Sequence, residues 1–129
     1  MEKRRSIDVP GARHVNPIPS ASRIGPFVVS GAISGADPAS GTVPEDLDAQ
    51  CAAMFANVRR VIETAGGTPD NIIKMNVWIT DRALRPIMNK YWVEMFPDPA
   101  SRPARHTIAS GDFSPPMQIQ CDLMAVIGD

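Results

Sequence analysis

The feature that most constrains this chain is a change in the spacing of its apolar residues near the middle. Up to residue 65 they recur every three or four positions, which is the period of one helix face. The stripe consists of Leu47, Cys51, Met54, Val58, Val61 or Ile62, and Ala65. From residue 73 to 79 apolar residues occupy every second position, the period of a strand. A helix followed closely by a strand is therefore predicted.

Local signals set the expected limits of this helix. Thr42 and Glu45 have the spacing of a capping box, in which the first side chain accepts an early helical N–H and the second reaches back. This pattern predicts a helix that begins near residue 42. Gly66 and Gly67 follow the stripe and predict an end in the left-handed conformation.

Similar signals predict the remaining elements. The β-branched run at 27–30 predicts a short strand, and Asp81 is placed to cap a second helix in which Pro86 is tolerable only in the first turn. Residues 105–109 are expected to be extended, 111–116 to form a turn, and 117–127 to alternate as a closing strand. Residues 1–22 are rich in Pro and Ser, which predicts an irregular lead-in or a short edge strand.

This order of elements predicts an α+β sandwich, a mixed sheet with two helices on one face. Apolar side chains on the other face have no layer to cover them in a chain of 129 residues, which is the size of one domain. They include Trp78, Met124 and Val126. A half-apolar bare face predicts a subunit interface and a homo-oligomer, with a ligand cleft between subunits.

Composition excludes several classes of protein. Hydrophobic residues make up 43% and charged residues 21% of the chain, as in an ordinary globular protein, and no long apolar run suggests a membrane span. The net charge of -1 lacks the basic excess of a nucleic-acid or anionic-membrane binder. Two cysteines and two histidines without CxxC spacing cannot build a common zinc cage. The absence of a secretion signal predicts a cytoplasmic protein with free thiols.

The sharpest local motif is the pentapeptide from Arg102 to His106. Pro103 stiffens the entry to the predicted strand, where the planar guanidinium of Arg105 could grip a small carboxylate through two hydrogen bonds. The alternative is a solvent-facing arginine at a strand start. The chain has no phosphate loop and no GxSxG nucleophile motif.

Nearly the whole chain, from about residue 15 to 127, resembles one family as a single domain. The matching stretches are Val29–Gly31, Gln50 with Asn57, Ala65–Gly66, 71–74 through 77–81, Asn89 with Trp92 and Phe96, and Pro103–Arg105. In this order and spacing they resemble the RidA/YjgF enamine and imine deaminases, whose members also carry the names endoribonuclease L-PSP and translation initiation inhibitor. The resemblance implies a chorismate-mutase-like fold and a homotrimer with a central β-barrel.

The resemblance also implies an activity: hydrolysis of 2-aminoacrylate and related 2-imino acids, such as 2-iminopropanoate and 2-iminobutanoate, to 2-keto acids and ammonia, without metal or cofactor. Arg105 matches the carboxylate-binding arginine. The expected catalytic residues are Arg105 and Gln120. The expected substrate-binding residues are Ser30, Gly31, Ile18, Trp92 and Thr107.

Several positions depart from the family pattern. Gln120 replaces a glutamate that positions or activates water, and an amide cannot take a proton. Asp122 shares its face but lies roughly 6 to 7 Å along the strand. Ile18 replaces a tyrosine, Ala32 a common glutamine, and His106 a serine or threonine; His106 should alternate away from Arg105.

Because of these departures, catalysis is left open. One alternative is a non-catalytic trimer that binds small carboxylates or a protein partner. Another is an endoribonuclease or translation inhibitor, against which the near-neutral charge and the 5% aromatic content weigh.

Overall fold

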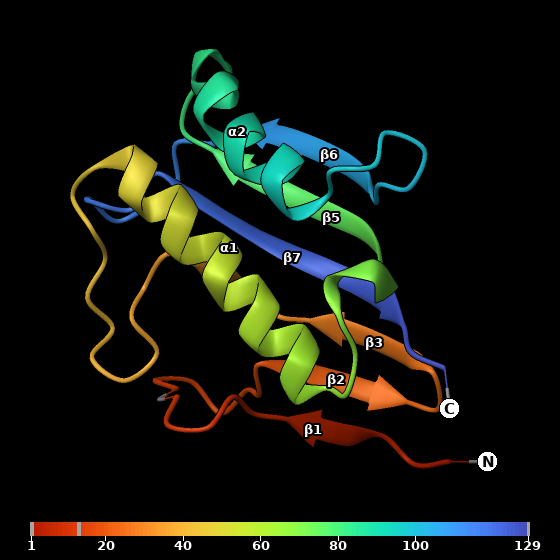
Figure 1. Ribbon diagram of the computed structural model, residues 1–129. Coiled ribbons are helices and arrows are strands. Elements are labelled where there is room, and N and C mark those ends of the chain that lie inside the picture. The colour runs from red at the N-terminus through yellow and green to blue at the C-terminus, as the bar shows by residue number, and fades with distance from the viewer. Residues whose placement is uncertain (1, 13, 129) are drawn as a thin grey trace.

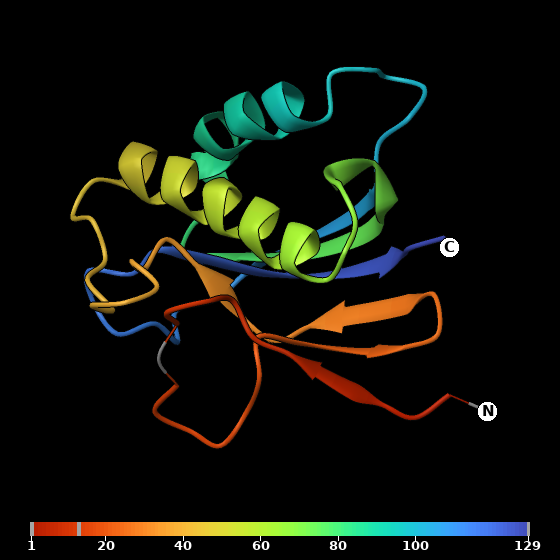
Figure 2. The same cartoon turned by 60° about the horizontal axis from the view of Figure 1, so that its bottom comes forward.

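The computed structural model describes residues 2–12 and 14–128, which form one mixed sheet with two helices on the same face (Figures 1 and 2). The strands are β1 (Arg5–Ile7), β2 (Ala21–Ile24), β3 (Phe27–Ser30), β4 (Ile33–Ser34), β5 (Ile72–Ile79), β6 (Ala104–Ala109) and β7 (Ile119–Val126). The helices are α1 (Leu47–Thr64) and α2 (Arg85–Met95). A short 3₁₀ turn, η1 (Pro69–Asn71), follows α1, and another, η2 (Arg82–Leu84), leads directly into α2. The predicted α+β architecture is confirmed.

The strand order differs from the order in the sequence. Hydrogen-bonded neighbours run β1-β2-β3-β7-β5-β6, and the two-residue β4 also pairs with β7. Only β5 and β6 are parallel, because the connection through α2 returns the chain to the same end of the sheet. The C-terminal strand β7 therefore lies in the middle, and β6 is an edge strand. The strands β2 and β4 were not among the predicted elements.

Helix α1 begins at Leu47 rather than near residue 42, so the predicted capping box is wrong. The cap is Asp46, whose side chain accepts from the Ala49 N–H. Thr42 instead closes a loop, because its carbonyl accepts from the Asp37 N–H at 2.9 Å. That loop holds residue 42 away from the helix axis and leaves capping to the next suitable side chain.

The predicted end of α1 is confirmed. Gly66 has a φ of +100°, and the Gly67 N–H donates to the Ile62 carbonyl at 2.9 Å. This is the hydrogen bond of a Schellman cap. The second helix forms where it is predicted, with Pro86 in the first turn of α2. Asp81 caps the turn η2 that leads into it, whereas the N-cap of α2 itself is Leu84, which makes no side-chain capping bond.

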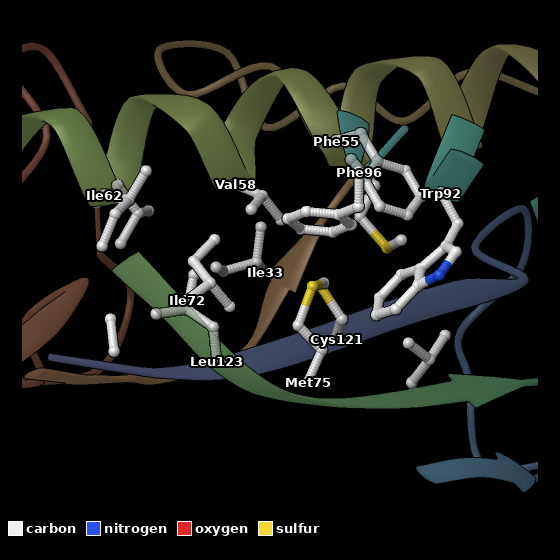
Figure 3. Packing of buried hydrophobic residues seen from close by; sticks show 14 of the residues in the cluster. Ile33, Phe55, Val58, Ile62, Ile72, Met75, Trp92, Phe96, Cys121 and Leu123 are labelled. Atoms are coloured by element: carbon white, nitrogen blue, oxygen red, sulfur yellow. The ribbon is translucent and has the colours of Figure 1, made fainter. Parts of the chain in front are cut away.

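The hydrophobic core lies between the two helices and the face of the sheet that they cover, here called the inner face (Figure 3). Figure 3 shows Val58 and Ile62 of α1 pointing toward Ile72 and Leu123 of the sheet. Gln50 is the one buried polar side chain in the described part of the chain, and its amide bonds the Pro44 and Pro116 carbonyls and the Gln118 N–H. It joins α1 to the loop before β7.

The opposite side of the sheet, here called the outer face, is not covered by any described element. Met124 and Val126 are 38% and 42% exposed there, beside Phe27 of β3, whose register partner is Val126. The predicted bare, partly apolar face is thus confirmed. No helix in the described residues is long and apolar enough to cross a membrane.

Candidate active site

Arg105 lies on the inner face at the start of the edge strand β6. In the register of the sheet it sits beside Met75 of β5, whose side chain is in the core. Its Nη1 donates to Asn89 Oδ1 at 2.8 Å, and its guanidinium lies 4.8 Å from the centroid of the Trp92 ring. Both partners belong to α2 and are three residues apart, so they share one helix face. The arginine is held in place and does not extend freely into solvent.

The electrostatic surroundings of Arg105 favour an anion. The side chain is about half-buried, and this burial, followed by the positive charge of Arg85, lowers the pKa of the guanidinium. The group stays charged at neutral pH all the same. Among the described residues no carboxylate lies within 4 Å of it. The remaining N–H donors are therefore suited to a ligand carboxylate.

Two other predicted residues lie with Arg105. Trp92 is buried and packs edge-on against Phe96, with ring centroids 4.8 Å apart. Thr107 is two residues beyond Arg105 on the same side of β6 and is half-buried. Asn89 was not among the predicted site residues. Its spacing to Trp92 on a helix was the signal that could have identified it.

Ser30 and Gly31 lie on the far side of β7 from this cluster. Ser30 Oγ accepts from the Leu123 N–H at 2.9 Å and donates to the Gly31 carbonyl at 2.8 Å. The hydroxyl thus fills the place where β3 and β4 separate along β7, which gives it a structural use that the sequence does not reveal. Gly31 and the half-exposed Ile18 both line a cavity of about 470 Å³.

Gln120 is also separated from Arg105. It pairs with Trp78 on β5 and Ser34 on β4, and its side chain alternates with the buried Ile119 and Cys121 onto the outer face. Arg105 points from the inner face. Strand β5 lies between β7, which carries Gln120, and β6, which carries Arg105, so the backbones of β7 and β6 run roughly 10 Å apart. One copy of the chain does not bring these two side chains together.

Gln120 has the apolar Trp78 directly opposite it on the outer face, and polar residues lie one step further along the strands. Asp122, one strand repeat away, accepts from Asn76 Nδ2 at 2.9 Å. His106 pairs with Asn76 from the other side and is exposed, so it does alternate away from Arg105. Asp122 is thereby tied to Asn76 and does not replace the missing carboxylate at position 120.

Comparisons with known proteins agree with the sequence resemblance. The family model described as Endoribonuclease L-PSP matches residues 16–127. A RutC family protein of Aquifex aeolicus is 30% identical over 124 residues, which cover 95% of this chain and 98% of the relative.

Solved structures have the same fold. RidA from the Antarctic bacterium Psychrobacter sp. PAMC 21119 superposes with a TM-score of 0.87 at 24% identity, covering 95% of this chain and 99% of the other. E. coli TdcF with bound serine gives 0.86 at 22% identity, with 96% and 99% covered. With its family model matched over most of its length, the chain belongs to the RidA/YjgF family, the endoribonuclease L-PSP family.

Proposed function

We propose that this protein hydrolyses 2-imino acids to 2-keto acids and ammonium at sites shared between two copies of the chain. The observation that carries the proposal is Arg105, a half-buried cation positioned by Asn89 and Trp92 at a sheet edge with no carboxylate partner among the described residues. The E. coli TdcF structure holds serine, a small molecule with the same α-carboxylate.

The chemistry needs few groups. Water adds to the carbon of the C=N bond and one of its protons moves to nitrogen, which gives a carbinolamine. The remaining hydroxyl proton then moves to nitrogen as well, and the C–N bond breaks as the C=O bond forms and ammonia leaves. Arg105 would bind the carboxylate through two parallel hydrogen bonds and so fix the position of the imine carbon. Gln120 of a second copy would hold the water. Its amide orients water without accepting the proton, which costs roughly a hundred- to ten-thousandfold in rate relative to a carboxylate base.

A homotrimer with the outer faces turned inward is the assembly that we propose. It would cover Met124 and Val126, and it would provide the second chain that a site with both Arg105 and Gln120 needs. Residues 15–127 would act in it as one domain.

The test is ammonia release from freshly generated 2-iminopropanoate. We expect Arg105→Ala to abolish it, and Gln120→Glu to raise the rate at least tenfold because a carboxylate can take the proton. Arg59→Ala, which removes an exposed arginine of α1, is the matched control and should leave turnover unchanged. Turnover that survives Arg105→Ala would refute the proposal.

One observation favours a second candidate function, binding without catalysis. Gln120 replaces the only group of the expected site able to act as a base, and Asp122 is committed to Asn76. Calorimetry that finds Arg105-dependent binding of 2-ketobutyrate, together with no ammonia release even in Gln120→Glu, would support this candidate over the enzyme.

A further inference from the structure

A large cavity opens beside Gly31, away from the Arg105 cluster of the same chain. Its volume is about 470 Å³. Its walls come from the N-terminal segment before β2, the end of β3, the loop between β4 and α1, and α1 itself; Figures 1 and 2 show that segment and that loop side by side. Apolar side chains line much of it, among them Val9, Ile18, Ile33 and Val61, and three titratable residues share the wall, namely His14, Asp37 and Arg60.

Two sets of hydrogen bonds hold the walls. On the α1 side, Asn57 Nδ2 donates to the Ser34 and Ala36 carbonyls, both at 2.8 Å, and so ties the loop after β4 to the helix. On the N-terminal side, Asp8 Oδ1 accepts from His14 Nε2 at 3.0 Å and from the Ser20 N–H at 3.2 Å. The first set joins the loop after β4 to α1, and the second joins parts of the N-terminal segment to each other at the surface.

The size of the cavity exceeds what the smallest imino acids need. About 470 Å³ corresponds to roughly fifteen water molecules in the liquid, at roughly 30 Å³ each. It also falls within the range typical of small-molecule sites. The methyl group of 2-iminopropanoate would leave most of it filled with water against apolar walls, whereas a phenyl or branched alkyl group would displace that water.

The position of the cavity links it to the proposed reaction. Gly31 and Ile18, two residues expected to contact the substrate, line it. Ile18 and Ala32 present a branched alkyl group and a methyl group at two places on its wall.

We propose that the cavity beside Gly31 receives the side chain of the imino acid, and that the protein prefers 2-imino acids with large apolar side chains, such as those derived from phenylalanine and leucine. This inference rests on the proposed function. A more apolar substrate gains from each methylene that the walls cover, and a well-fitted pocket distinguishes one methylene by roughly tenfold or more.

The experiment compares imino acids generated in situ from phenylalanine, leucine and alanine by an amino-acid oxidase. We expect kcat/KM for the phenylalanine- and leucine-derived compounds to exceed that for the alanine-derived one at least tenfold in the full chain. Ala32→Trp fills the cavity and should reduce this ratio to about one. Ala39→Phe fills it from the loop and should act alike, so the test does not depend on one variant folding.

Ala52→Trp is the matched control, because Ala52 is exposed on α1 in a different groove, and it should keep the ratio. A wild-type ratio of one or less, or a ratio that both cavity variants leave unchanged, would overturn the inference. If no imino acid is hydrolysed in an Arg105-dependent way, the proposed function fails instead. Calorimetry with phenylpyruvate and pyruvate then tests the pocket alone: tighter phenylpyruvate binding that Ala32→Trp removes would support it, and equal binding would refute it.

Discussion

Asn89 shows how one neutral side chain can set the properties of a charged one. It accepts from Arg105 at 2.8 Å without neutralising it, so the guanidinium is oriented and still available to an anion. Trp92 adds a ring on which the cation packs. We regard both as positioning residues.

Replacing the Asn89 amide by a carboxylate should give Arg105 a negatively charged partner within the chain and so weaken the binding of a ligand carboxylate. In Asn89→Asp the new charge pairs with Arg105 and competes with the ligand, so the Kd for 2-ketobutyrate should rise about tenfold or more. The fold should be unaffected because the hydrogen bond remains. Asn16→Asp, in an exposed segment, is the control for the added charge. Calorimetry showing equal affinity in both variants would contradict this role.

The two cysteines should make stability fall at alkaline pH. Burial, followed by the charge of Asp48, raises the pKa of the Cys51 thiol to about 11, and burial, followed by the charge of Asp122, raises the pKa of Cys121 further. An unfolded thiol ionises near pH 8.5. Above that pH the folded protein keeps protons that the unfolded chain has released.

The free energy of unfolding should therefore decrease with pH, by at most about 1.4 kcal/mol per pH unit for each thiol. Urea unfolding at several pH values between 7.5 and 10 measures this slope. The double variant Cys51→Ala, Cys121→Ala will be less stable at pH 7.5 because it leaves cavities, and its slope should be shallower. Equal slopes would show that the thiols do not contribute.

At the scale of elements, the beginning of α1 is decided by one side chain out of two candidates. Asp46 accepts the Ala49 N–H, whereas Thr42 belongs to the preceding loop. Asp46→Ala should lower the free energy of unfolding by about 1 kcal/mol, the usual value of a helix cap. Thr42→Ala should change it by less than about 0.5 kcal/mol. Urea midpoints at constant m-value measure both changes. A larger loss of unfolding free energy in Thr42→Ala than in Asp46→Ala would show that Thr42 is the helix cap after all.

Elements also show what spacing alone can establish. The stripe of α1, the Gly66 end, the early Pro86 and the alternation of β5 from Met75 to Ile79 appear as predicted, because each depends on neighbours along the chain. The alternation is wrong at Ile73, which is 51% exposed, because a register shift between Ile72 and Lys74 puts Ile72 in the core instead. The short strands β2 and β4 have no such signal. They form because β7 offers a partner for β3 and β4, and β3 in turn offers one for β2.

At the scale of the whole molecule, the outer face exposes apolar side chains that a second copy of the chain could cover. We expect a mass near 42 kDa by light scattering, three times the 13.9 kDa of one chain. Met124→Glu places a charge on that face and should yield a species of about 14 kDa. Val93→Glu is the matched control, since Val93 is 47% exposed on α2 away from this face. A trimer that tolerates Met124→Glu, or a wild-type monomer, would reject the assembly.

The sequence by itself determined the class of fold, the two helices and the bare apolar face, because the periodicity of apolar residues is a local property; it singled out Arg105 as a candidate only through the local motif together with the family resemblance. Only the tertiary structure decided which side chains meet. The insertion of β7 between β3 and β5 puts Gln120 on the outer face, while the partnership with α2 holds Arg105 on the inner face. The tertiary structure also places the Ser30 hydroxyl where it accepts from the Leu123 N–H, and it forms the cavity beside Gly31. Strand pairing joins residues far apart in the chain, and no short-range pattern records it.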